Sequence, residues 1–214
     1  MTGGRGRVRS RSISQRKFLV FCTLMCVITM AAAMIYGRFL REKIYLFIGD
    51  SYAARLESEG YSRENVIIYA VPGITAKKLN DGRKEFPDIK PDKVVLCVGI
   101  NSLVEMTGGN IEIEDEKQLI FNLREQYGVP VYVQKVFPVG KALVESKPML
   151  TVENIEEYNR LLKVYCDKEE GVLFFDPQEG FLDEEGYLLH TEDDLHIADD
   201  YMELYYRNIM KEIQ

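Results

Sequence analysis

Five short apolar runs constrain the fold of this chain more than any other feature. They are continuous rather than alternating, and most are β-branched or aromatic. They lie at Ile44–Ile48, Val66–Tyr69, Val94–Val98, Val131–Val136 and Val172–Phe175. Such runs predict strands buried on both faces. Helical patterns separate them, which indicates a parallel sheet covered by helices. The sequence therefore predicts one α/β domain over residues 44–214, a three-layer sandwich around a five-stranded parallel sheet.

Apolar residues at spacings of three and four predict the helices that cover this sheet. The clearest stripe lies within Glu153–Lys168, and similar stripes lie within Leu119–Tyr127 and Met202–Ile213. We interpret these stripes as core faces rather than as cofactor-binding surfaces. The stretch Gly140–Pro148 is predicted to be the longest irregular segment, which either shapes a substrate mouth or merely connects two elements.

The first 43 residues differ from the rest of the chain in charge. They carry nine Lys or Arg against one Glu, whereas residues 44–214 carry 18 against 33, so the formal charge of −7 divides into +8 and −15. So acidic a domain is not expected to bind nucleic acid. Residues 1–17 are predicted to be a basic cytoplasmic tail, and residues 37–43 a short linker.

An uncharged apolar run, residues 18–36, predicts one transmembrane helix. Its 19 residues, at about 1.5 Å each, nearly span a hydrocarbon core of about 30 Å. Six cationic residues precede the run and three follow it closely, so we expect a single-pass cell-membrane protein with a cytoplasmic N-terminus and an extracytoplasmic domain. The alternatives are a cleaved signal peptide, suggested by Ala31–Ala33, and a buried core helix.

The four cysteines and two histidines do not form a metal-binding pattern. Cys22 and Cys26 lie within the apolar run and Cys97 lies in a predicted strand, so only Cys166 remains. We interpret the cysteines as small hydrophobic residues, and no metal-ligand spacing involves them or the histidines. No metal site is therefore expected.

Residues that can carry chemistry follow directly after the predicted strands, where open α/β sheets bind their ligands. The segments are Gly49-Asp50-Ser51-Tyr52, Val71-Pro72-Gly73 and Gly99-Ile100-Asn101-Ser102, with Asp193-Asp194-Leu195-His196 before the last helix. Ser51 is placed at a helix start, where unpaired backbone N–H groups face a developing negative charge. This position suits a nucleophile.

A serine nucleophile needs a neighbouring base, and the chain offers two histidines. We favour His196, because Asp193 lies three residues before it and can accept a hydrogen bond from Nδ1 that holds the productive tautomer. His190 is the rival base, and its nearby upstream carboxylates are those of Glu184 and Glu185.

Two further residues are expected to complete an oxyanion site with the Ser51 backbone N–H. Gly73 has no side chain, so its N–H can approach a substrate, and Asn101 can donate its side-chain amide. Each residue alone also has an ordinary structural explanation as a helix cap or turn residue, and the acids at 192–194 are typical of a solvated face. Together, at one edge of one sheet, they predict an acyl-transfer site.

These segments resemble the four blocks of the SGNH (GDSL-type) hydrolases, serine esterases and lipases named for Ser, Gly, Asn and His. The resemblance covers nearly all of residues 44–214, including Ile155–Asp176 and Phe181–Tyr201. It implies a flavodoxin-like sheet and no metal or organic cofactor. The implied catalytic residues are Ser51, Asp193 and His196, and the implied oxyanion hole is formed by Ser51, Gly73 and Asn101.

The chain departs from the family pattern at two positions beside the site. The family often has Leu or His where this chain has Tyr52, and Asp where it has Ser102. The shape of the acyl pocket and the bracing of the loops therefore depend on residues particular to this chain. Together with Asp50, these two residues are candidates for substrate binding.

The resemblance implies activity on acetylated carbohydrates, peptidoglycan, lysophospholipids or acyl thioesters. A domain joined to its anchor by about seven residues works at the membrane surface. We therefore expect a serine esterase that removes short O-acyl groups, above all acetyl, from cell-envelope carbohydrate, and the resemblance implies a bacterial envelope. The alternatives are a lysophospholipase or thioesterase acting on lipid, a sugar O-acyltransferase, and a non-catalytic envelope-binding protein on the same fold.

Overall fold

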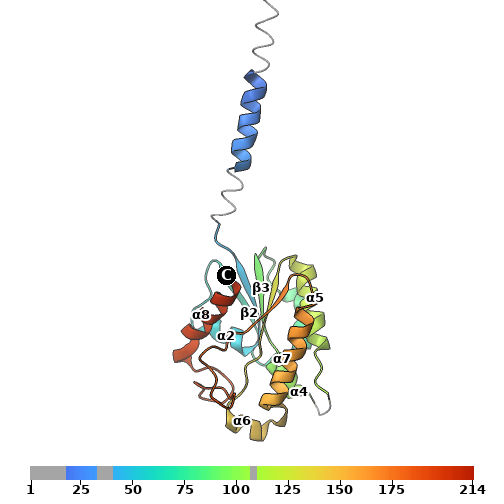
Figure 1. The fold of residues 1–214 in the computed structure, drawn as a ribbon, viewed down its shortest axis with the longest axis vertical. Helices are drawn as coiled ribbons and strands as arrows, with labels where there is room; N and C mark the ends of the chain where they lie inside the picture. The colour runs from blue at the N-terminus through green and yellow to red at the C-terminus, as the bar shows by residue number, and fades with distance from the viewer. Residues whose placement is uncertain (1–17, 33–40, 107–109) are drawn as a thin grey trace, which may run out of the picture. The chain divides into compact units, whose positions relative to one another are not determined.

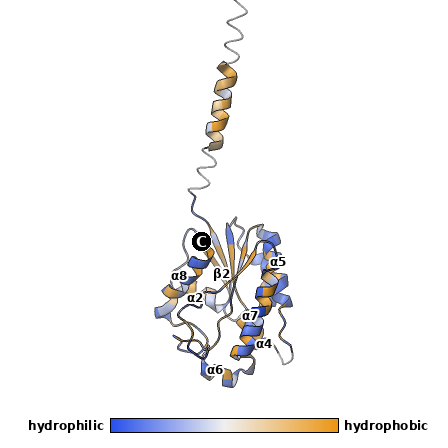
Figure 2. Cartoon of the chain, in the orientation of Figure 1, coloured by the Kyte–Doolittle hydropathy of each residue, from blue (hydrophilic) through white to orange (hydrophobic). Residues whose placement is uncertain are grey.

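A computed structural model describes residues 18–32, 41–106 and 110–214. The chain divides into two compact units, Met1–Glu42 and Lys43–Gln214, and each is described by itself. In the first unit, residues 18–32 form one helix whose side chains are mostly apolar and exposed (Figure 2). Two threonine hydroxyls of this helix donate to carbonyls of the preceding turn, from Thr23 to Leu19 at 2.8 Å and from Thr29 to Met25 at 3.0 Å.

The predicted membrane span is only partly covered by this helix. Residues 33–36 lie outside the described residues, as do the predicted tail, 1–17, and positions 37–40 of the predicted linker. Within the described ranges, no helix has the length and hydropathy that crossing a membrane requires. The transmembrane helix therefore stays a prediction.

The second unit is built around a sheet of five parallel strands in the order β2-β1-β3-β4-β5 (Figure 1). The strands are β1 (Tyr45–Gly49), β2 (Val66–Ala70), β3 (Lys93–Cys97), β4 (Val131–Gln134) and β5 (Val172–Phe175). Each begins and ends within two residues of its predicted bounds. The predicted α/β fold with a five-stranded parallel sheet is therefore confirmed.

Helices cover both faces of this sheet (Figure 1). One layer holds α2 (Ser51–Ser58) and α8 (Met202–Ile213), and the other holds α3 (Ala76–Asp81), α5 (Glu114–Tyr127) and α7 (Val152–Cys166). The remaining elements are α4 (Ile100–Glu105), α6 (Lys141–Ser146) and the 3₁₀ turns Arg83–Glu85, Pro148–Leu150 and Asp199–Tyr201. This arrangement is the predicted three-layer sandwich.

Strand β1 lies at the centre of the core because both of its faces are covered. Tyr45 and Phe47 pack in the cluster that includes α2 and α8, whereas Leu46 and Ile48 pack in the cluster that includes α3 and α5. All five residues of the strand are buried. A strand with no solvated face has no place for polar alternation, which is why its sequence is continuously apolar.

The segment Gly140–Pro148 differs from the prediction of an irregular loop. Lys141–Ser146 forms helix α6, and Leu143 and Val144 are half-buried against the core cluster that includes α7. Six residues hold fewer than two helical turns, so no recurring apolar stripe exists to be read from the sequence. The prediction was wrong here because helix formation depends on a tertiary contact.

Candidate active site

Ser51 begins helix α2 directly after β1. The preceding residue, Asp50, is the N-cap of this helix, and its Oδ1 accepts a hydrogen bond from the Tyr52 backbone N–H at 3.1 Å. A Cβ on Gly49 would collide with the carbonyl oxygen of Cys97, so only glycine allows the ends of β1 and β3 to pack this closely. The strand order changes direction between β1 and β3, which is the point where α/β sheets bind ligands.

His196 joins Ser51 and Asp193 in one hydrogen-bonded row. Its Nε2 lies 2.8 Å from Ser51 Oγ, and its Nδ1 lies 2.6 Å from Asp193 Oδ2. A carboxylate accepts from Nδ1–H, so Nε2 is left unprotonated and can accept the proton of the serine hydroxyl. The structure thus brings together the three side chains that the sequence predicted as a catalytic set.

The Asp193 carboxyl is held in its charged form. Burial raises its pKa, but hydrogen bonds from the His196 ring and from the backbone N–H groups of His196, at 2.7 Å, and Leu195, at 3.0 Å, outweigh burial. The pKa of Asp193 is therefore well below its usual range. A carboxylate that stays ionised at neutral pH can stabilise a positive charge on the imidazole.

The loop that carries His196 is fixed by bonds from two distant segments. The Tyr52 hydroxyl donates to the Leu195 carbonyl at 2.7 Å, and the Gly140 N–H donates to the Asp194 carbonyl at 2.6 Å. Asp194 itself has a φ of 60°, a left-handed conformation that Asp tolerates better than most residues. Helix α2 therefore carries Ser51 and also braces the loop that presents the imidazole to it.

Gly73 and Asn101 follow β2 and β3, at the same edge of the sheet as Ser51. Gly73 has a φ of 74°, in the left-handed region that favours glycine. Asn101 lies in the first turn of α4, and its Nδ2 donates to Asp50 Oδ2 at 3.3 Å. An amide nitrogen carries two hydrogens, so one remains for a substrate oxygen.

Asp50 and Tyr52 lie beneath the site. Their exposed fractions are 1% and 6%, and burial raises the pKa of Asp50 to about 7 although bonds from Tyr52 and Asn101 oppose the rise. The polar groups of both side chains are hydrogen-bonded to other parts of the protein. These bonds favour a structural role and do not support the predicted direct contact with substrate. Ser102 is half-buried, and its Oγ accepts from the Ala76 N–H at 3.4 Å.

His190 is engaged elsewhere in the same loop region. Its ring stacks on Tyr201 with 3.7 Å between centroids, and its carbonyl accepts the Ala198 N–H at 2.6 Å. Its φ of 57° lies in the left-handed region. The geometry therefore favours His196 over His190 as the partner of Ser51.

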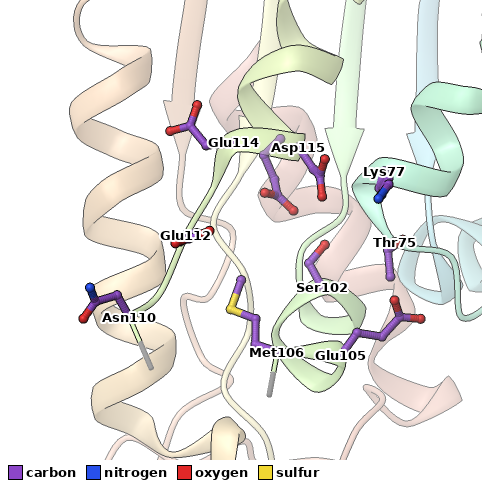
Figure 3. A pocket seen from close by; sticks show the side chains of 10 residues that line it. Thr75, Lys77, Ser102, Glu105, Met106, Asn110, Glu112, Glu114 and Asp115 are labelled. Carbon is purple, nitrogen blue, oxygen red and sulfur yellow. The ribbon is translucent and has the colours of Figure 1, made fainter. Parts of the chain in front are cut away.

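Sequence reasoning missed a groove of about 720 Å³ beside these residues (Figure 3). Thr75 and Ser102 line it, together with Glu105 of α4 and acidic residues at the start of α5. The run Glu112–Glu116 was the available signal, but acidic residues also mark ordinary helix starts. Among the residues with described positions, no three His, Cys, Asp or Glu side chains are placed to hold a metal ion.

Residues 46–203 match the profile of the GDSL-like Lipase/Acylhydrolase family. Among solved structures, a putative platelet activating factor from Streptococcus pneumoniae is similar at 18% identity and a TM-score of 0.70, over 80% of this chain and 84% of the other. No curated protein sequence matches the chain.

Two further solved structures share the fold. The catalytic domain of peptidoglycan O-acetyltransferase A from Streptococcus pneumoniae has 17% identity and a TM-score of 0.57, over 80% of this chain and 93% of the other. A mutant acetylxylan esterase from Geobacillus stearothermophilus has 18% identity and a TM-score of 0.56, over 80% and 94%. At these identities the similarity shows a common fold.

Proposed function

Because the chain belongs to the GDSL-like lipase/acylhydrolase family and is an ester hydrolase, we propose that it is a serine esterase that removes short O-acyl groups, above all acetyl, from cell-envelope carbohydrate. The observation that carries this proposal is the hydrogen-bonded row of Asp193, His196 and Ser51. It lies at the sheet edge where Gly73 and Asn101 follow β2 and β3, the strands on either side of β1.

The reaction proceeds through an acyl-enzyme. Ser51 Oγ attacks the ester carbonyl carbon while His196 Nε2 takes the hydroxyl proton, and the oxyanion is held by the backbone N–H groups of Ser51 and Gly73 and by Asn101 Nδ2. His196 then protonates the leaving alcohol oxygen. Water gives a proton to the same Nε2 and attacks the acyl carbon, and Nε2 returns this proton to Ser51 Oγ as the acid is released. Asp193 stabilises the imidazolium in both steps.

Two observations support a short acyl group on carbohydrate. The groove beside the site is lined largely by charged side chains, which disfavour contact with a long hydrocarbon chain. Two proteins with the same fold are, by name, a peptidoglycan O-acetyltransferase and an acetylxylan esterase. The similarity to the O-acetyltransferase also supports a second candidate function, in which a sugar hydroxyl replaces water as the acceptor of the acyl group.

The proposal includes a membrane anchor with the domain on the extracytoplasmic side. It is supported by the apolar helix over residues 18–32, whose threonine hydroxyls are satisfied within the helix as a lipid environment requires. The basic residues before and after the apolar run support a cytoplasmic N-terminus.

Hydrolysis of p-nitrophenyl acetate, butyrate and octanoate by the full chain in detergent tests the function. We expect the acetyl ester to be cleaved fastest, and Ser51→Ala to lower the rate by at least about 10³-fold. Ser58→Ala, an exposed serine at the other end of α2, is the matched control and should leave the rate unchanged.

The other outcomes of this assay identify the alternatives. A preference for octanoate would indicate a lipid esterase and not a carbohydrate esterase. Turnover that appears only when a sugar acceptor is added would identify an acyltransferase. Equal rates with and without the Ser51 hydroxyl would identify a non-catalytic protein.

A further inference from the structure

The groove of about 720 Å³ opens beside the oxyanion donors. Thr75 follows Gly73 by two residues and Ser102 follows Asn101 by one, so both oxyanion segments lead into the groove. Figure 3 shows Ser102 and Glu105 of α4 facing the groove across from Asp115 of α5.

The groove is strongly acidic. Among the described residues, five carboxylates and one lysine, Lys77, line it. Two of the carboxylates have cationic partners, because Glu105 pairs with Lys78 at 2.6 Å and Glu114 pairs with Lys117 at 2.6 Å. The remaining carboxylates are those of Glu112, Asp115 and Glu116, and they make no ion pair with any described residue. The groove thus presents uncompensated negative charge.

Helix formation explains part of this acidity but not Glu116. Carboxylates in the first turn of α5 interact favourably with the helix dipole, which accounts for the exposed Glu114 and Asp115. Glu116 is only 3% exposed, and its Oε1 has no hydrogen-bond partner among the described residues. An unpaired buried carboxylate oxygen costs free energy, so its place at the groove indicates a missing partner.

Polar side chains surround the buried carboxyl of Glu116. Burial raises the pKa of its carboxyl, and the nearby hydroxyls of Ser102 and Tyr158 oppose part of the rise. The Tyr158 hydroxyl is itself fully buried beside this carboxyl. A donor with positive charge that reaches Glu116 would satisfy the carboxylate and offset its burial.

We propose that this groove binds a protonated amino group of the carbohydrate substrate, with Glu116 as its partner, so that the enzyme acts on esters of polysaccharide that contains free amino sugars. The inference rests on the proposed function, since it specifies the class of carbohydrate. An ammonium group donates up to three hydrogen bonds, and its positive charge is opposite to the net charge of the lining. An acetyl group would leave most of the groove empty, whereas a volume of this size is typical of sites for larger ligands.

Calorimetric binding to the full chain in detergent tests the inference. The probes are the β-1,4-linked disaccharide of glucosamine, which has free amines, and the same disaccharide with both amines acetylated. We expect the free-amine disaccharide to bind about tenfold more tightly, because only its ammonium group can form a hydrogen bond between charged groups with Glu116. Glu116→Gln should remove most of this preference, because it keeps the shape of the side chain and removes its charge.

Two further variants complete the design. Glu125→Gln changes the same charge at an exposed position in the last turn of α5, outside the groove, and should keep the preference. The double variant Glu112→Gln, Asp115→Asn alters only exposed groove carboxylates, and should reduce the preference even if Glu116→Gln does not fold.

Equal affinity for the two disaccharides would overturn the inference, and so would a preference that survives in both groove variants. Neither probe contains an ester, so binding is measured independently of catalysis. If the wild-type chain does not hydrolyse the p-nitrophenyl esters, the proposed function is overturned instead. The two failures are therefore distinguishable.

Discussion

The Asn101 side chain donates a hydrogen bond to the carboxyl of Asp50, with 3.3 Å between Nδ2 and Oδ2. Asp50 is buried and caps the helix that begins with Ser51, so this bond ties the start of α4 to the start of α2. One Nδ2 hydrogen is occupied by the bond, and the other is available to a developing oxyanion. In the proposed mechanism, Asp50 is therefore a positioning residue that acts through Asn101.

Asn101→Ala should lower kcat for p-nitrophenyl acetate by about 10²- to 10³-fold, because one donor to the oxyanion is lost at the point where charge develops. KM should change little, since a ground-state ester binds this donor weakly. Asn122→Ala on α5, which removes a bond to Asn80, is the control and should retain kcat. An unchanged kcat in Asn101→Ala would remove this side chain from the oxyanion site.

Asp50→Asn should change how stability depends on pH. Burial raises the pKa of Asp50 from 3.8 to about 7, so between these values the folded chain holds a proton that the unfolded chain has released. This group therefore lowers the free energy of unfolding as pH rises through the window, by at most about 1.4 kcal/mol per pH unit.

Urea unfolding at about pH 5 and pH 7 measures this effect. As pH rises, the free energy of unfolding of Asp50→Asn should increase relative to that of the wild type. Parallel pH profiles for the two proteins would show that Asp50 does not titrate in this range.

Asp193→Asn should lower kcat on the order of 10⁴-fold, because an amide cannot hold the imidazole in its productive tautomer or stabilise the imidazolium. The fold should survive, because the amide oxygen can still accept the backbone N–H bonds of Leu195 and His196. Asp194→Asn is the matched control, since Asn tolerates its left-handed φ of 60°. Similar kcat values for both variants would contradict the assigned role of Asp193.

His196→Ala should abolish turnover, whereas His190→Ala should retain kcat and lose thermal stability through the missing stack on Tyr201. Ester hydrolysis and thermal unfolding of the two variants separate these effects. Loss of turnover with His190→Ala but not with His196→Ala would reverse the assignment.

The strands and the edge that bears the site are predictable from the sequence because they depend on local patterns. A strand buried on both faces must be continuously apolar, and the polar residues that follow β1, β2 and β3 must meet at one edge of a parallel sheet. These two facts were sufficient to place Ser51, Gly73 and Asn101 together. The pairing of Asp193 with His196 follows from their separation of three residues in one loop.

The features of the site that could not be predicted from the sequence depend on tertiary contacts. Tyr52 reads as a pocket residue beside the nucleophile, yet its hydroxyl reaches Leu195, which lies 143 residues away. Glu116 reads as an ordinary first-turn carboxylate, and only the packed structure shows that its side chain is buried beside a groove. Neither burial nor a contact of such sequence separation leaves a local pattern.

The separation of Ser51 from His196 also has a consequence for the order in which the protein is made. The two side chains that form the 2.8 Å hydrogen bond are 145 residues apart. During translation Ser51 leaves the ribosome long before His196, and a serine hydroxyl without its base is a weak nucleophile. The pair that activates the hydroxyl of Ser51 can therefore form only after most of the domain has been synthesised.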